Sequence, residues 1–535
     1  MEGMNLRRLL TILLLCLLLC TAGCCHTDSS RAADEKTVLL NELRECWRGL
    51  EQKRLPAVQQ AQLTERYNTA LQQMLHLYHE ARMARGAAAD ADFPFIVRYE
   101  QKHSLDDALQ VYDDFLISSK VDCEHLEEHY TVKGLGVPLV GIIPAESLAQ
   151  ANRPFAVRSH GTVSNITAVM DFPRGGRPHL HLLLRPRHET YAGHPLAGDF
   201  SAPLEIYGRL TGLKKGRFLG LLRPAELAER DMTGLSCMES YDPNKIPVVL
   251  THGLMSSAAT FDDLLNRLMN DPDIRRRYQF WFYNYPTGVA WTQTAAHFRE
   301  SLAEARRKLD PKHRNRHWDK MVLIGHSMGG LITHYSQCTQ PWLLLQNGGS
   351  LRQERLAPFM NARYVDKAFE DDSLEYFRKQ YFFRPVQAGL VIYLATPHRG
   401  APLARYRITR LLNHLIELPQ GLASEALNIL TLSDDLFIFE PSRLTDWYTS
   451  VSQLSPTSYS IRGLQGLAVR AVPTHSVIGD QGEEGPKEES SDGVVPYWSS
   501  HIPWGEEMLV PASHSVQDNA RTADYLKEVL KKYAA

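Results

Sequence analysis

Residues Met321 to Gly330 read MVLIGHSMGG, and this stretch decides the fold expected for the chain. Its apolar start suits a buried strand, and GHSMG then fits G-x-S-x-G, a turn that carries a nucleophilic serine between a strand and a helix. Ser327 would occupy a strained corner, where side chains at positions 325 and 329 would collide with neighbouring backbone. The apolar run LITHY after Gly330 suits the helix that must follow. The pattern predicts a nucleophile at Ser327.

Length and composition bound the class of protein. The chain has 535 residues, a formal net charge of -2 and 44% hydrophobic residues. These values predict a globular protein of two or three domains. The absence of excess positive charge argues against nucleic acid as a partner.

The N-terminus has the pattern of an export signal. Two arginines precede an apolar run from Leu9 to Cys20, which is short for a transmembrane span. Small residues then lead to Cys24, which resembles a bacterial lipobox, although Thr21 stands where leucine is more usual. We therefore expect a signal peptide at 1–24, a lipid on Cys24 and a membrane-anchored lipoprotein of the cell envelope. The alternatives are a plain secretory signal, which would make the protein secreted, and an N-terminal anchor helix.

Three regions follow the signal. Residues 25–130 carry apolar residues at helical spacing and predict a helical region that begins with a hairpin. Residues 131–236 contain short apolar runs between glycines and prolines, including Leu204 to Tyr207, and predict a β-rich, antiparallel, sandwich-like subdomain. In residues 237–535 buried strands alternate with helices, which predicts a doubly wound, mostly parallel α/β sheet. The ligand site of such a sheet lies beyond the carboxyl ends of its strands.

The spacing of the histidines and cysteines does not predict a metal site. Four histidines lie close together between residues 179 and 194, but neither an acidic residue nor a cysteine accompanies them at ligand spacing. We interpret them as strand and loop residues, and we expect neither a metal nor an organic cofactor. The four are His179, His181, His188 and His194.

A nucleophilic serine needs a base to accept its proton and an acid to orient that base. Folds with this turn place them in the chain order serine, acid, histidine. His514 is the favoured base because it lies between a last apolar run and a terminal helix, whereas His475 and His501 are weaker candidates. Asp492, in the turn SSDGVVP, is the favoured acid, and Asp480, which follows an apolar run, is the alternative.

The reaction also needs donors for an oxyanion. The backbone N–H of Met328, directly after the nucleophile, is one candidate. The other should come from the turn after an early strand, and VVLTHGL at 248–254 supplies one. Gly253 lets the backbone approach, so the N–H of Leu254 is the second candidate.

Together these motifs resemble the α/β-hydrolase superfamily, in particular its lipase- and esterase-like members. The resemblance implies a serine hydrolase that cleaves carboxylic esters through an acyl-enzyme, with a small-molecule or lipid ester as substrate. The turn ATPHRG resembles the one after the strand that follows the nucleophile, and it is assigned no catalytic role. The resemblance covers about Ile246 to Tyr533 and rests on HG at 252–253, GHSMGG at 325–330, ATPHRG at 395–400, DGVVP at 492–496 and His514.

Two insertions are expected to form a cap over the active-site side. They span about 341–385 and about 406–459, the first rich in aromatic residues and the second in leucine. Apolar caps favour lipid esters. Two other functions are compatible with the sequence: an acyltransferase that uses the same triad, and a non-catalytic envelope lipoprotein on a hydrolase fold.

Overall fold

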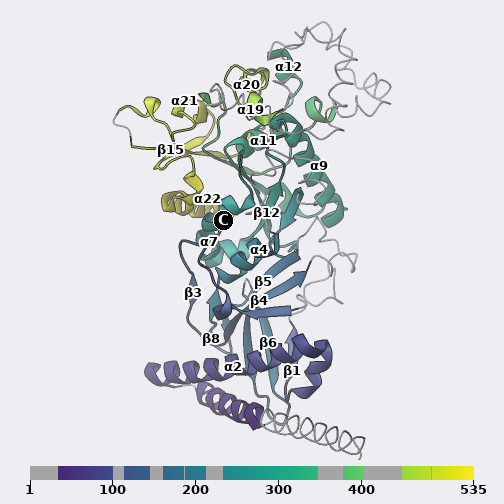
Figure 1. Cartoon of the computed structure of the whole chain (residues 1–535), viewed down its shortest axis with the longest axis vertical. Helices are drawn as coiled ribbons and strands as arrows, with labels where there is room; N and C mark the ends of the chain where they lie inside the picture. The colour runs from purple at the N-terminus through teal and green to yellow at the C-terminus, as the bar shows by residue number, and fades with distance from the viewer. Residues whose placement is uncertain are drawn as a thin grey trace, which may run out of the picture. The chain divides into compact units, whose positions relative to one another are not determined.

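The structure is a computed structural model of the chain, shown in Figure 1. It describes residues 34–52, 54–99, 114–144, 161–185, 187–211, 233–347, 378–402, 449–482 and 485–534. These residues form two compact units. The first contains the described residues up to Val121 with those of Thr131–Gly141 and Asn165–Asp199. The second contains the described residues of Asp122–Tyr130, of Ile142–Ser164 and from Phe200 onward.

Two helices begin the first unit. One covers residues 34–50, and α2 covers Ala57–Arg85. Buried side chains recur every three or four residues along α2, from Tyr67 to Tyr78, so they share one face of the helix. α2 ends at Arg85, and Gly86 caps it with a φ of 60°, a conformation that glycine adopts readily. A 3₁₀ helix, η1 (Gly86–Asp92), follows.

Most of one five-stranded sheet, in the order β1-β6-β5-β4-β2, belongs to the first unit, whereas the end of β4 and the start of β5 are counted with the second. β5 and β6 are antiparallel, whereas β1 and β6 are parallel. The predicted antiparallel, sandwich-like arrangement is therefore wrong, because these strands form a single sheet and β1 pairs parallel with β6. Two of the strands, β1 and β2, come from the region predicted to be helical. The strands are β1 (Ile96–Tyr99), β2 (Asp114–Ile117), β4 (Val137–Pro144), β5 (Gly161–Asp171) and β6 (His179–Leu184), with short pairs β3 (Thr131–Val132) and β9 (Gly198–Asp199), and β7 (Thr190–Tyr191) and β8 (His194–Pro195).

One predicted strand is a helix. Leu204 to Tyr207 lie in α4 (Ala202–Thr211), where every residue from Ala202 to Tyr207 is buried. A short apolar run that is buried on all sides shows no periodicity, so it does not distinguish a strand from a helix. The prediction of a strand at this position is wrong for that reason.

The second unit is built on a seven-stranded sheet in the order β10-β12-β11-β13-β14-β15-β16. β10 pairs antiparallel with β12, and all the other neighbouring strands are parallel. This confirms the predicted mostly parallel α/β sheet. The strands are β10 (Gly234–Cys237), β11 (Ile246–Thr251), β12 (Tyr278–Asn284), β13 (Val322–His326), β14 (Leu390–Leu394), β15 (Thr474–Asp480) and β16 (Glu506–Pro511).

Helices alternate with these strands along the chain, as Figure 1 shows. They are α7 (Asp262–Met269), α8 (Pro272–Arg277), α9 (Trp291–Leu309), α10 (Arg316–Asp319), α11 (Met328–Ser336), α12 (Leu343–Asn347), α19 (Ser450–Gln453), α20 (Tyr459–Leu464), α21 (Tyr497–Ser500) and α22 (Ala520–Ala534). Among the described residues, the 3₁₀ helices beyond η1 are η2 (Ser118–Lys120), η4 (Ala258–Phe261), η7 (Lys487–Glu489) and η8 (Val516–Asp518).

Helices cover both faces of the seven-stranded sheet. On one face, Leu323 of β13 belongs to the same buried cluster as Phe298 of α9 and Tyr335 of α11. On the other face, Tyr278 of β12 donates its hydroxyl hydrogen to the backbone carbonyl of Leu530 in α22. Burial on both faces explains why these strands read as continuous apolar runs rather than as alternating ones.

Several expectations fall outside the described residues. Residues 1–33 are not among them, so the predicted signal and Cys24 are not described. Of the predicted caps, residues 348–377 and 406–448 are likewise outside the described part. A search of the described helices found none with both the length and the apolar character needed to cross a bilayer.

Candidate active site

The stretch around Ser327 forms a sharp turn between a strand and a helix. β13 ends at His326, and α11 begins at Met328. Ser327 between them has φ 53° and ψ -122°, a backbone conformation that is strained for a residue with a side chain. The turn projects the serine at the carboxyl end of a central strand, where parallel α/β sheets bind their ligands.

The glycines on either side of Ser327 are required by close backbone contacts. A Cβ atom at Gly325 would lie 2.6 Å from the carbonyl oxygen of Gly329. A Cβ atom at Gly329 would collide with the backbone carbonyl of Thr251 in β11. These contacts agree with the collisions expected from the sequence.

Ser327, His514 and Asp492 lie in one chain of hydrogen bonds. The Nε2 atom of His514 lies 2.8 Å from the Oγ atom of Ser327. The Nδ1 atom of the same ring lies 2.7 Å from Oδ2 of Asp492. The structure thus brings together the three residues favoured by the sequence. The carboxylate of Asp492 accepts a hydrogen bond from the N–H group at Nδ1 of His514. The neutral ring therefore presents the lone pair of Nε2 to the hydroxyl of Ser327.

Asp492 is a buried carboxylate with both oxygens engaged. Its relative exposure is only 1%. Oδ1 accepts the backbone N–H groups of Val494 and Val495 at 2.8 and 2.6 Å, and Oδ2 faces His514. A buried anion is tolerated when its oxygens are hydrogen-bonded in this way. The turn therefore fixes the carboxylate in one orientation.

The alternative acid and bases have other partners. Oδ1 of Asp480 accepts the backbone N–H of Gly482 at 3.0 Å, so this carboxylate closes a turn at the end of β15. The ring of His475 contacts the hydroxyl of Tyr525 at 2.8 Å. Nδ1 of His501 lies 2.5 Å from Oε1 of Glu507.

The turn that carries Leu254 lies beside the nucleophile. A Cβ atom on Gly253 would lie 2.9 Å from the Cβ atom of Ser327. Tyr285 holds this turn in two ways: its hydroxyl donates to the backbone carbonyl of His252 at 2.5 Å, and its ring stacks on the imidazole at 4.3 Å between centroids. The N–H of Met328 starts α11 next to Ser327, where the helix dipole favours negative charge.

His326 has a role that the sequence does not predict. Its Nε2 atom donates to the backbone carbonyl of His514 at 2.9 Å. Burial lowers the pKa of His326 to about 3, so its ring is neutral at ordinary pH. The residue occupies the first variable position of G-x-S-x-G, and nothing in the sequence indicates that it bonds a loop distant in the chain. Here it helps to position the backbone that carries the base.

The turn after β14 joins neighbouring loops. Arg399 donates to the backbone carbonyls of Trp498 and His501 at 2.7 and 2.6 Å. His398 and His334 are both buried, with their Nδ1 atoms 2.9 Å apart. Burial lowers the pKa of both rings, so the pair is neutral. These contacts give the ATPHRG turn a structural explanation.

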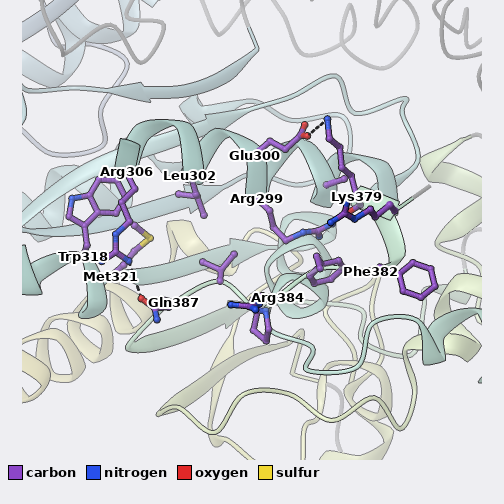
Figure 2. Close-up of a pocket in the computed structure, with 16 residues that line it drawn as sticks. Arg299, Glu300, Leu302, Arg306, Trp318, Met321, Lys379, Phe382, Arg384 and Gln387 are labelled. Carbon is purple, nitrogen blue, oxygen red and sulfur yellow. Dashed lines mark hydrogen bonds and ion pairs between the residues drawn. The ribbon is translucent and has the colours of Figure 1, made fainter. Parts of the chain in front are cut away.

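A cavity of about 480 Å³ lies between α9 and the segment 378–387 (Figure 2). Its wall includes Arg299, which is buried and stacks on the ring of Phe383 at 3.4 Å. Burial lowers the pKa of Arg299 to about 10. Neither Ser327 nor His514 lines this cavity, so it is separate from the hydrogen-bonded chain of the candidate site.

Comparison with known proteins gives low similarity. The sequence matches no family model and no curated protein. Among solved structures, the mature lipase of Bacillus licheniformis aligns at 15% identity and TM-score 0.27, over 54% of this chain and 93% of that one. A metagenomic carboxyl esterase aligns at 16% identity and TM-score 0.28, over 55% of this chain and 76% of that one. A lipase-esterase related protein of Clostridium acetobutylicum aligns at 10% identity and TM-score 0.24, over 55% of this chain and 96% of that one. Similarity at this level does not indicate a function for this chain.

Proposed function

We propose that this chain is an α/β-hydrolase that cleaves carboxylic esters by serine catalysis. One observation carries the proposal: the hydrogen-bonded chain Ser327–His514–Asp492 at a strained turn between a strand and a helix. A strained serine, an oriented imidazole and a buried carboxylate together are what acyl transfer to a hydroxyl requires. The similarity between the sequence motifs and those of lipase-like hydrolases supports the same conclusion.

The mechanism follows from these positions. His514 Nε2 takes the proton of Ser327 as its Oγ atom attacks the acyl carbon. Asp492 keeps the ring in the required tautomer and stabilises the imidazolium that forms. The oxyanion of the tetrahedral intermediate accepts the N–H groups of Leu254 and Met328.

The reaction continues with release of the alcohol and hydrolysis of the acyl-enzyme. The His514 imidazolium protonates the departing alkoxide, which leaves an acyl group on Ser327. A water molecule then attacks the acyl carbon and gives its proton to the same ring. The imidazolium returns that proton to Oγ of Ser327 as the bond to the acyl group breaks and the acid leaves. The ester substrate is expected to carry an apolar acyl group, because the predicted caps at about 341–385 and 406–459 are rich in aromatic residues and leucine.

Ser327→Ala tests the proposal directly. The wild type should hydrolyse p-nitrophenyl esters and label with a fluorophosphonate probe, and the variant should do neither. Ser119→Ala, which changes an exposed serine of η2, should behave as the wild type. If the wild type neither labels nor hydrolyses short or long esters, the proposal is wrong.

We further propose that Cys24 anchors the chain to a membrane of the cell envelope. The support is the lipobox-like sequence at the end of the predicted signal. A Cys24→Ala variant expressed in a bacterial host should move from the membrane fraction to the soluble fraction. Retention of that variant in the membrane fraction would contradict the proposed anchor.

A further inference from the structure

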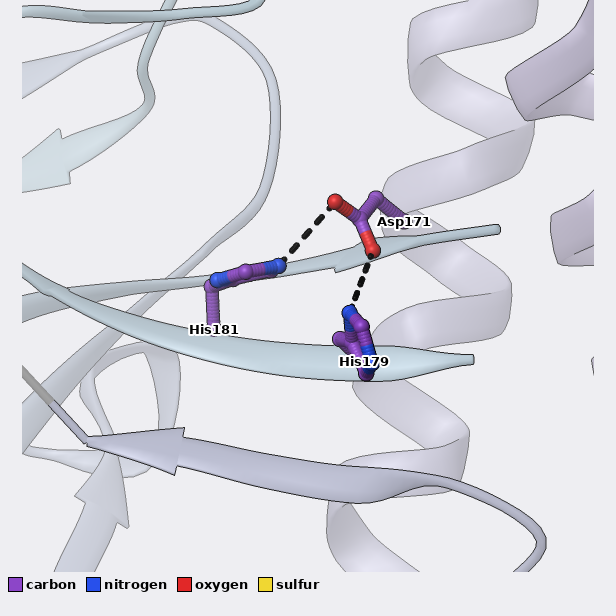
Figure 3. Close-up of side chains that lie close together, drawn as sticks. All are labelled: Asp171, His179 and His181. Carbon is purple, nitrogen blue, oxygen red and sulfur yellow. Dashed lines mark ion pairs between the residues drawn. The ribbon is translucent and has the colours of Figure 1, made fainter. Parts of the chain in front are cut away.

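A second group of reactive side chains lies in the first unit, on β5 and β6. His179 and His181 are two residues apart on β6, so they project from the same face of the sheet. Asp171 of β5 is the direct cross-strand partner of His179 in this antiparallel pair. Figure 3 shows the carboxylate between the two rings. No acidic residue accompanies these histidines at ligand spacing along the sequence, but the neighbouring strand supplies one, Asp171.

The spacing of the three side chains fits a small metal ion. The Nδ1 atom of His179 lies 3.4 Å from Oδ1 of Asp171, and Nε2 of His181 lies 3.1 Å from Oδ2. One ligand atom from each residue lies within 4.8 Å of the other two. Tetrahedral ligands with bonds of about 2.0–2.2 Å lie roughly 3.3–3.6 Å apart. Small rotations of the side chains would bring one ligand atom of each residue within bonding distance of the same ion.

The hydrogen bonding of the group is incomplete. Oδ1 of Asp171 and Nε2 of His181 are buried atoms that approach the neighbouring side chains at 3.4 and 3.1 Å without the geometry of a hydrogen bond. A buried polar atom without a well-formed hydrogen bond is costly, and a bound cation would satisfy both of these atoms. Oδ2 of Asp171 accepts the hydroxyl of Tyr191 at 2.8 Å. Such a hydrogen bond to a ligating carboxylate is common around metal ions because it fixes the orientation of the ligand.

We propose that Asp171, His179 and His181 bind one divalent transition-metal ion, with Zn²⁺ the ion best suited to the set. Two imidazole nitrogens and one carboxylate oxygen suit Zn²⁺, whereas Mg²⁺ and Ca²⁺ require mostly oxygen ligands. The three side chains are 21 to 23% exposed, so solvent can reach the site and supply the fourth ligand. The ion would cross-link β5 to β6, and this role is independent of the chemistry at Ser327.

Arg98 is the neighbouring cation. Its Nη2 atom lies 3.5 Å from Nε2 of His179, on the opposite side of the ring from Nδ1. A metal on Nδ1 places a hydrogen on Nε2 that faces this guanidinium. The Arg98 side chain is exposed, so we expect it to turn to solvent when metal binds. Arg98→Ala should therefore bind Zn²⁺ more tightly than the wild type.

The test measures binding of Zn²⁺ to the full-length protein after treatment with a chelator. Isothermal titration should find one more high-affinity equivalent of Zn²⁺ in the wild type than in an Asp171→Asn, His181→Gln double variant. His76→Gln, which changes a histidine whose side chain is 58% exposed, should bind as the wild type and accounts for binding to surface histidines. Mg²⁺ should not compete. Equal Zn²⁺ stoichiometry and affinity in the wild type and the double variant would overturn the proposal.

A second measurement covers the case in which the double variant does not fold. Modification of histidines by diethylpyrocarbonate, mapped by mass spectrometry on the wild type, should show His179 and His181 protected by Zn²⁺ and His76 unprotected. Equal modification of His179 and His181 with and without Zn²⁺ would contradict the site. Both measurements are independent of esterase activity, so they do not depend on the proposed hydrolase function.

Discussion

The imidazole of His514 lies 2.8 Å from the hydroxyl of Ser327, although 187 residues separate the two along the chain. The sheet explains this proximity. β13 carries Ser327 at its carboxyl end, and His514 follows the carboxyl end of β16. All strands from β13 to β16 run parallel, so the turns after them gather at one edge of the sheet.

The acid can be identified by comparing two isosteric substitutions. Asp492→Asn should lower kcat by about 10⁴-fold, because the amide no longer holds His514 in the required tautomer. Asp480→Asn should change kcat little, because its carboxylate serves the turn to Gly482. The measurement is the steady-state hydrolysis of a p-nitrophenyl ester by both variants. Loss of activity with Asp480→Asn alone would assign the acid to Asp480.

The close contact at Gly329 predicts a loss of both stability and activity. Gly329→Ala places a methyl group against the backbone carbonyl of Thr251, which cannot yield as a side chain can. We expect a destabilisation of about 1–3 kcal/mol and a strong loss of kcat, measured by urea unfolding and ester hydrolysis. Gly208→Ala is the control, because Gly208 lies within α4 and has nothing within 4 Å of the added methyl. Equal stability of the two variants would contradict the packing described for the turn.

The sequence predicted much of the candidate site because each of its parts is local. G-x-S-x-G needs only one strand, one turn and one helix, and its glycines follow from backbone contacts at Ser327. The favoured positions of Asp492 and His514 followed from the order in which such folds use their strands. A short motif followed by turns in the expected order carries enough information to place these residues.

Other features depend on contacts between strands or on burial, which the sequence does not show. Asp171 joins His179 and His181 only because β5 and β6 pair in one particular register. The run at Leu204 to Tyr207 is buried throughout, so its helical form left no periodic signal. His326 contacts a backbone atom 188 residues away, and backbone partners leave no trace in residue types.

Tyr285 offers a test of the oxyanion turn that leaves the three reacting side chains intact. Tyr285→Phe removes the hydroxyl that donates to the backbone carbonyl of His252. The buried carbonyl loses its partner, at a cost of about 1–3 kcal/mol, and the turn that carries Leu254 can shift. We expect kcat to fall roughly tenfold with little change in KM, since a donor to the oxyanion acts mainly in the transition state.

Tyr283→Phe is the matched control for this substitution. Tyr283, near the end of β12, is buried like Tyr285, but its hydroxyl donates to the backbone carbonyl of Thr294 in α9 at 3.2 Å. Its loss should lower stability and leave kcat near the wild-type value. If both variants show the same kcat, the hydroxyl of Tyr285 has no part in positioning the turn.

Buried histidines predict how stability depends on pH. Burial lowers the pKa of His252 to about 4 and that of His326 and His334 to about 3, whereas an unfolded histidine titrates near about 6.5. Below about pH 6.5 the unfolded chain binds protons that the folded chain does not, so stability falls as pH falls from about 6.5 towards the folded pKa values. Each histidine contributes a slope of up to about 1.4 kcal/mol per pH unit.

Urea unfolding at pH 7.5, 6 and 5 measures this dependence, and His334→Gln identifies one of its sources. The variant loses one buried titrating group, so its stability should fall less steeply between pH 6 and pH 5 than that of the wild type. The difference between the two proteins, rather than the absolute slope, is decisive because carboxylates elsewhere titrate identically in both. An identical slope in His334→Gln and the wild type would mean that this ring accepts a proton in the folded state, against its burial beside His398.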